Sequence, residues 1–237
     1  MKELFIREKD DRRLRLTVVI TVLAAMLFLL VFTGCSPAKV DAVDQTKPLA
    51  TVSFTVDQSS KYAPSFAVWI VDAQSGETAT LYATKKAAEN KWSGASERPG
   101  ALPVWWPVRG QGATDVNTSA TPGGKDVSLT LQIPDGFAGK QLKFFVEANV
   151  SYDYNDYYKG GLKSGDEGYN DVNGQPSVVW MAEADTSAAP SGTLAPAIIG
   201  HGDVLGANTD VEADMSHITT ASSILTNLSI QYDFSGK

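Results

Sequence analysis

Apolar and polar residues alternate along several stretches of this chain, and a period of two predicts β-strands. The longest such run covers residues 142–154, where every second residue is apolar and the opposite face, which includes Lys143 and Glu147, is mostly polar. Residues 66–71 are apolar on both faces, which is typical of a central strand of a sandwich. Further strands are predicted at residues 52–56, 127–133, 178–184 and 228–234.

Turn-forming residues separate the predicted strands. The sequence AQSG at residues 73–76 leads into residues 78–84 and predicts a β-hairpin, whereas residues 85–91 are the one helix-permissive stretch. Residues 184–196 are of low complexity and are expected to form an exposed loop. Seven to nine strands in about 190 residues predict an all-β fold: an immunoglobulin-like antiparallel β-sandwich after an N-terminal signal or anchor helix.

The N-terminal segment combines a basic start, an apolar run and the only cysteine of the chain. Residues 12–15 are rich in arginine, residues 17–32 are apolar, and Cys35 follows directly after a small residue. This order is typical of a bacterial lipoprotein signal, which is cut before the cysteine so that its thiol can be lipidated. An uncleaved anchor, which needs about 20 apolar residues, and a plain secretory signal are the alternatives. Phe32 stands where such signals usually carry leucine.

This interpretation divides the chain into a signal peptide (1–35, ending at lipidated Cys35), a flexible tether (36–48) and a single β-sandwich domain (49–237). It predicts an extracytoplasmic, membrane-anchored protein of the periplasm or the cell surface. Without residues 1–34 the chain keeps 14 basic and 23 acidic side chains, a net charge of −9. Because an acidic surface repels nucleic acid, the predicted partners are the membrane, through the lipid, and a protein of the cell envelope.

No catalytic constellation stands out in the sequence. A serine or cysteine hydrolase needs a base beside its nucleophile. The chain has two histidines and no G-x-S-x-G motif, and with Cys35 lipidated it has no thiol. We therefore predict a non-enzymatic binding or accessory module.

Three groups of residues suggest ligand binding as an alternative function. His201, Asp203 and His217 are candidate metal ligands, although an exposed loop histidine is the other interpretation. The stretch 153–173 carries oxygen ligands suited to Ca²⁺ without EF-hand spacing, as well as several tyrosines. Such tyrosines, and the tryptophans at 105–106, could stack on a sugar or a flat cofactor instead of packing in the core. A glycan- or calcium-binding surface protein is thus one alternative.

Several short segments, taken together, resemble a family of bacterial extracytoplasmic proteins described as predicted periplasmic proteins of unknown function. The resemblance covers roughly residues 50–235. It implies an immunoglobulin-like sandwich related to flagellar-hook-cap modules, and it implies no established activity. The segments that carry it are residues 68–72, 80–82, 92–99, 101–105, 133–137, 146–149, 173–177 and 199–202.

The resemblance sharpens the interpretation of one loop, which composition alone describes only as exposed. Residues 115–121 (DVNTSAT) are similar to the motif D-x-x-[ST]-G-A-T, at which a flavin transferase joins FMN to a threonine through a phosphoester. Ser119 stands where the motif usually has glycine. Glycine permits backbone angles that serine resists. FMN on Thr121 would make the chain an electron carrier in an extracytoplasmic redox chain, with Trp105 and Trp106 near the flavin in sequence. The matching positions are Asp115, Thr118, Ala120 and Thr121.

Overall fold

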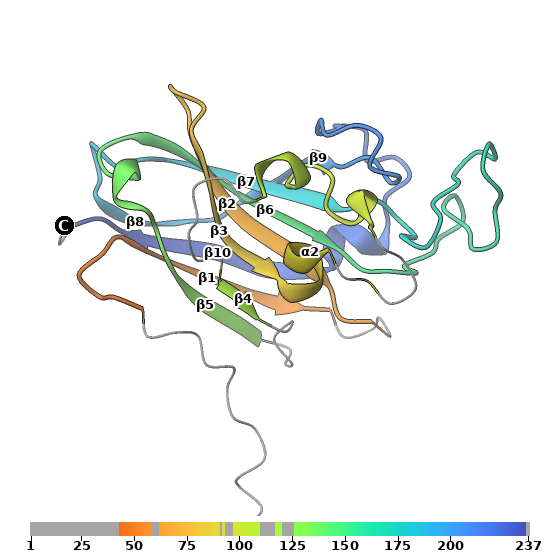
Figure 1. The fold of residues 1–237 in the computed structure, drawn as a ribbon, viewed down its shortest axis with the longest axis horizontal. Helices are drawn as coiled ribbons and strands as arrows, with labels where there is room; N and C mark the ends of the chain where they lie inside the picture. The colour runs from red at the N-terminus through yellow and green to blue at the C-terminus, as the bar shows by residue number, and fades with distance from the viewer. Residues whose placement is uncertain are drawn as a thin grey trace, which may run out of the picture. The chain divides into compact units, whose positions relative to one another are not determined.

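A computed structural model of the chain describes residues 43–57, 62–90, 92, 97–109, 117–119 and 126–235 (Figure 1). The chain divides into two compact units, Met1–Lys39 and Val40–Lys237, and the described residues all belong to the second unit. The predicted signal peptide with Cys35 lies outside the described residues. The first strand begins at Leu49, where the predicted tether ends.

Ten strands in the described part of the chain form two sheets, which confirms the predicted all-β sandwich. One sheet has the order β5-β1-β10-β8 and the other the order β4-β3-β2-β6-β7-β9. Neighbouring strands are antiparallel, except that β4 runs parallel to β3. The strands are β1 (Leu49–Val56), β2 (Ser65–Asp72), β3 (Thr78–Thr84), β4 (Asn117–Ser119), β5 (Asp126–Gln132), β6 (Gln141–Asn149), β7 (Val178–Asp185), β8 (Ser191–Leu194), β9 (Ala197–His201) and β10 (Leu225–Asp233).

Helical structure in the described residues is limited to short segments. The α-helix α2 (Lys85–Glu89) follows β3 directly and ends at Asn90, which has a left-handed backbone conformation with φ of 51°. This conformation stops the helix two residues before the end of the predicted helix-permissive stretch. The remaining turns are 3₁₀-helices: η1 (Pro99–Ala101), η2 (Trp106–Val108), η3 (Asp135–Phe137) and η4 (Thr220–Ser223).

The main core lies between the two sheets and is built from the alternating residues of the strands. In β1, Val52 and Phe54 point inward and are buried, and in β6 the same holds for Phe144 and Val146. Removing such a side chain from water contributes about 1.5–3 kcal/mol each. The period-two pattern therefore translates directly into the hydrophobic interior of the sandwich.

A second apolar cluster covers the outer face of the six-stranded sheet. Trp69 of β2 stacks on Phe145 of β6 with ring centroids 5.0 Å apart, and Trp105 is buried beside them. The covering elements are α2 and residues 97–109, which we call the strap, both drawn in yellow to yellow-green in Figure 1. This second layer explains why β2 is apolar on both faces.

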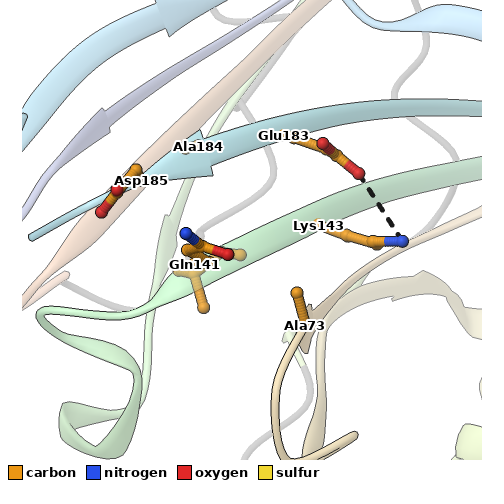
Figure 2. A pocket seen from close by; sticks show the side chains of 7 residues that line it. Ala73, Gln141, Lys143, Glu183, Ala184 and Asp185 are labelled. Atoms are coloured by element: carbon orange, nitrogen blue, oxygen red, sulfur yellow. Dashed lines mark ion pairs between the residues drawn. The ribbon is translucent and has the colours of Figure 1, made fainter. Parts of the chain in front are cut away.

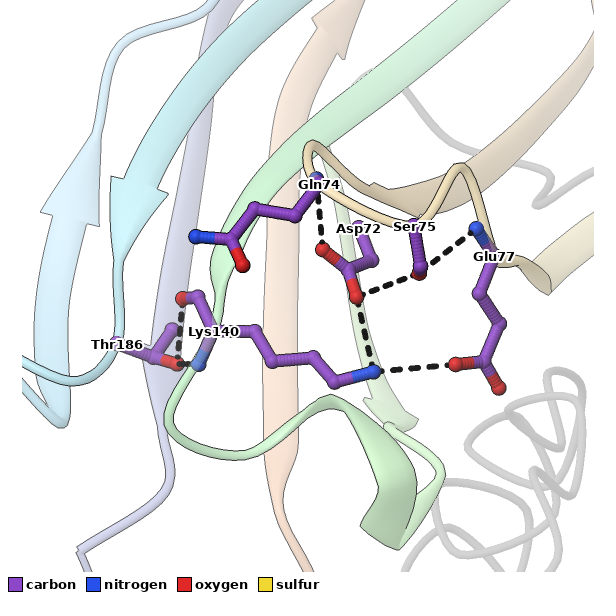
Figure 3. Close-up of polar contacts among 6 residues, drawn as sticks. All are labelled: Asp72, Gln74, Ser75, Glu77, Lys140 and Thr186. Atoms are coloured by element: carbon purple, nitrogen blue, oxygen red, sulfur yellow. Dashed lines mark hydrogen bonds and ion pairs between the residues drawn. The ribbon is translucent and has the colours of Figure 1, made fainter.

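The β2–β3 hairpin is confirmed and is braced by a polar network (Figure 3). The Asp72 carboxylate accepts hydrogen bonds from the Ser75 hydroxyl at 2.6 Å and from the Gln74 N–H at 2.9 Å. Lys140 lies 2.9 Å from Asp72 and 3.1 Å from Glu77. The Ser75 hydrogen bond, with those from Gln74 and Lys140, holds the pKa of Asp72 well below its ordinary value. The network ties the hairpin to the loop before β6.

Three sequence predictions about loops and strand ends were wrong. The long alternating run does not continue to residue 154, because β6 ends at Asn149 and the chain turns at Tyr152, whose φ is 63°. Strand β8 lies within the low-complexity stretch 184–196 and pairs with β10. Strand β4 lies within the predicted loop 115–121. Both short strands form through backbone hydrogen bonds with a neighbour, so side-chain composition does not reveal them.

Candidate functional site

The described residues include only part of the predicted FMN motif. Asp115, Ala120 and Thr121 lie outside them, and so does the lipidation candidate Cys35. Thr118 lies in β4, where its backbone is opposite Ala83 of β3. Strand β4 ends with Ser119 opposite Thr84, the residue directly before α2.

The three candidate metal ligands are not brought together. His201 ends β9 with 6% of its surface exposed, and its ring nitrogens bond the carbonyl oxygens of Gly202 and Asp214 at 2.8 and 3.0 Å. His217 instead stacks on Tyr157 with ring centroids 3.7 Å apart. No cluster of three His, Cys, Asp or Glu side chains suited to a metal ion occurs within the described residues. The described structure therefore does not gather His201, Asp203 and His217 into one metal site, and His201 is buried rather than an exposed loop histidine.

Three of the calcium candidates in the β6–β7 loop, Asp153, Asn155 and Asn173, serve as internal braces. This loop projects from one end of the sandwich in Figure 1, in teal. The carboxylate of Asp153 accepts hydrogen bonds from Thr220 at 2.7 Å and from Gln175 at 2.9 Å. The amide of Asn155 donates to the His217 carbonyl at 2.8 Å, and the amide of Asn173 donates to a carbonyl of the β9–β10 connection. These oxygens and amides shape the loop rather than surround one point.

The two adjacent tryptophans are not an exposed stacking platform. Trp105 is buried with 1% exposure, and its indole N–H donates to the Thr80 hydroxyl at 3.1 Å. The ring of Trp106 is covered by the guanidinium of Arg109, 3.7 Å from the ring centroid. Trp105 therefore anchors the strap to the sheet, and its ring is closed to a ligand.

A polar pocket of about 290 Å³ lies beside the strap, and we call it the Arg98 pocket. Its walls come from four chain segments: the residues before and at the start of β2, helix α2, the segment containing Trp92 and Arg98, and the turn after β6. The lining residues are Tyr62, Ala63, Ser65, Lys86, Trp92, Arg98, Ser151 and Tyr152. The pocket thus combines two cations with three aromatic rings.

Arg98 is half-buried and held by neutral partners. Its guanidinium donates to the Ser151 hydroxyl at 2.9 Å and to the Asn173 side-chain oxygen, and it lies 4.7 Å from the centroid of the Trp92 ring. Burial lowers the pKa of Arg98 from its ordinary value. Its Nε is buried without a hydrogen-bond partner. Of the five N–H groups of the guanidinium, two donate hydrogen bonds to described residues.

Lys86 adds a second positive charge to the pocket. It projects from α2, while its neighbour Lys85 pairs with Glu89 at 3.6 Å. Within the part of the chain that the structure describes, no carboxylate lies within ion-pair distance of Lys86 or Arg98. Two cations without a described counter-ion are notable on a chain with a net charge of −7.

A buried carboxylate fixes the strap that carries Arg98. Glu147 of β6 is completely buried. Its carboxylate accepts hydrogen bonds from the Ser177 hydroxyl at 2.6 Å and from the backbone N–H groups of Trp105 at 2.7 Å and Val104 at 3.3 Å. Burial raises the pKa of Glu147 to about 7, although these hydrogen bonds act in the opposite direction. The sequence pattern placed Glu147 on a polar, exposed face. The one signal against that placement was Phe145 on the same face.

A second pocket, at the far end of β6 and β7, is a weaker candidate (Figure 2). Its charged side chains Lys143 and Glu183 pair with each other at 3.5 Å. Asp185 is occupied by the Ser187 hydroxyl and the N–H groups of the turn that follows. Its polar groups therefore satisfy one another, in contrast to those of the Arg98 pocket.

Comparison with known proteins adds no relative, since no protein-family model, curated protein or solved structure matches the chain. Within the residues that the structure describes, no helix is long and apolar enough to cross a membrane.

Proposed function

We propose that this chain is a non-catalytic binding module of the bacterial cell envelope that captures an oxyanion in the Arg98 pocket. One observation carries the proposal: Arg98 and Lys86 line one pocket and have no carboxylate partner among the described residues. The sequence signal at Cys35 supports a lipid anchor. From there the tether of residues 36–48 would reach no more than about 45 Å, which keeps the pocket close to the membrane.

The charge balance favours an anion in this pocket. A half-buried guanidinium loses hydration, and a charge-assisted hydrogen bond to an oxyanion compensates for that loss better than neutral partners do. Each terminal nitrogen of the Arg98 guanidinium gives one N–H to Ser151 or Asn173, so the second N–H of each is a donor that bound phosphate or carboxylate could use.

The Arg98→Gln variant tests this function. We expect the mature domain to bind inorganic phosphate with a Kd of about 1 mM. The Arg98→Gln substitution should raise this Kd at least tenfold. Arg98→Lys, which keeps the charge and loses the fork of donors, should fall between the two. Binding is measured by following the indole N–H signals in NMR titrations.

Arg109→Gln is the matched control, since Arg109 is exposed and covers Trp106 outside the pocket. Thermal unfolding of each variant checks that the fold is kept. The function is refuted if wild-type protein gives no saturable response, or if Arg109→Gln weakens phosphate binding as much as Arg98→Gln.

A covalent flavin on Thr121 is the second candidate function, and one observation favours it. Strand β4 lies beside β3 and ends opposite Thr84, directly before the helix that carries Lys86. In the sequence, Thr121 follows two residues after the end of β4. The described part of the motif therefore ends opposite the residue that precedes the helix carrying Lys86, and the positive charge of that helix would suit the phosphate of FMN.

Intact mass and visible absorption, measured on protein co-expressed with a flavin transferase, test the lipid and the flavin together. We expect a lipid increment on Cys35 and, if the motif is functional, one FMN increment that Thr121→Ala abolishes. Ser119→Gly, which restores the usual glycine, should raise the flavin-loaded fraction. Thr193→Ala, at an exposed position of β8, is the control and should leave the loading unchanged. A colourless protein of lipidated mass would remove the flavin candidate and leave the anchored binding module.

A further inference from the structure

Two tyrosine rings form one wall of the Arg98 pocket. Tyr62 and Tyr152 both line it, and their ring centroids are 5.1 Å apart. The two residues are 41% and 44% exposed, so their rings are accessible to a ligand. The other lining residues include the cations Lys86 and Arg98 and the third aromatic ring, Trp92.

The backbone of Tyr152 is held in an unfavourable conformation that keeps its ring in this wall. Its φ is 63°, in the left-handed region, which costs a bulky residue on the order of 1 kcal/mol or more. The turn is fixed by the hydrogen bond from the Tyr152 N–H to the Val172 carbonyl at 3.1 Å. It also packs tightly on Gly174, where a Cβ atom would lie 2.5 Å from the backbone nitrogen of Asp153. Such strain is typical of positions that hold a side chain for binding.

The charged and aromatic walls belong to the same small space. Arg98 donates to Ser151, the residue directly before Tyr152, so the guanidinium and the tyrosine wall are fixed to one turn. The volume of about 290 Å³ is at the lower end of small-molecule sites. It suits one ring with one charged substituent rather than a polymer.

We infer that the ligand of the Arg98 pocket is a ring-bearing oxyanion: a phosphate or carboxylate group on an aromatic or sugar ring. The oxyanion contacts Arg98 and Lys86, and the ring lies against Tyr62 and Tyr152. This inference rests on the proposed function, because it names the class of ligand that the same pocket takes. An aromatic ring would pack on this wall through its π face, and a sugar ring through the C–H groups of one of its faces.

Matched probes separate the two halves of the ligand. Two probes, phenyl phosphate and glucose 6-phosphate, carry both a ring and a phosphate. Inorganic phosphate carries only the oxyanion, whereas phenol and glucose carry only the ring. We expect at least one ring phosphate to bind wild-type protein about tenfold more tightly than inorganic phosphate. In the Tyr152→Asn variant this advantage should fall to about twofold or less, with inorganic phosphate unaffected. Asparagine tolerates the left-handed conformation, so the turn is kept. Tyr152→Phe, which retains the ring, should preserve the advantage.

Each outcome has one meaning. If the ring phosphate that binds better is phenyl phosphate, the ring is aromatic, and if it is glucose 6-phosphate, the ring is a sugar. If inorganic phosphate binds through Arg98 but neither ring phosphate binds more tightly, the inference fails and the proposed function stands. The oxyanion is not what the pocket recognises if phenol or glucose binds as tightly as its phosphate and Arg98→Gln has no effect on that binding. This result would overturn both the inference and the proposed function.

Discussion

The Glu147→Leu variant is expected to lose about 3 kcal/mol of its free energy of unfolding. The carboxylate of Glu147 accepts hydrogen bonds from Ser177, Trp105 and Val104, and leucine would leave these donors buried without a partner. Each buried, unsatisfied donor costs about 1–3 kcal/mol, and the removal of a buried carboxyl group offsets part of the sum. The loss should be measured by urea unfolding at pH 6.

Glu183→Leu is the matched control for this experiment. Glu183 lies on the neighbouring strand β7, pairs with Lys143 at the surface and is well exposed. Exposed ion pairs contribute about 0–1 kcal/mol, so this variant should change little. A loss below 1 kcal/mol for Glu147→Leu would mean that the strap is held without the carboxylate. Phosphate binding is a second readout of the same variant. Because Glu147→Leu should loosen the strap that carries Arg98, it should also weaken phosphate binding.

The pH dependence of stability provides the second large effect. Burial raises the pKa of Glu147 from 4.5 to about 7, so the folded chain binds a proton more tightly than the unfolded chain does. The stabilisation by this proton is complete below about pH 4.5 and is lost as the pH rises through about 7. A shift of this size corresponds to a difference on the order of 3 kcal/mol between the two ends of the window. Unfolding free energies at pH 5 and pH 8 measure it.

Glu147→Gln isolates this contribution from those of other groups. Glutamine cannot ionise, so the difference in stability between wild type and variant should change by on the order of 3 kcal/mol between pH 5 and pH 8. Asp72, Asp185 and Asp214 have lowered pKa values, and their contributions appear at lower pH and are common to both proteins. Parallel pH profiles for the two proteins would show that Glu147 does not titrate in this window.

The alternating pattern predicted the strands of the main core well. The runs at residues 52–56, 127–133, 178–184 and 228–234 became β1, β5, β7 and β10. The reason is local, because side chains two residues apart on a strand share a face and are buried together. The hairpin turn at residues 73–76 was equally readable, with Gly76 at a φ of 72°.

The sequence by itself determined the all-β class and the main core strands, since both depend on near neighbours in the chain. Only the tertiary structure decided the site. Arg98, Lys86 and Tyr152 come from separate segments and meet because the strap and α2 fold over the outer face of the sheet. The same covering buries Glu147, whose place on a strand indicated an exposed side chain. Burial and contacts across the chain depend on which segments pack over a face, and period-two alternation carries no information about that.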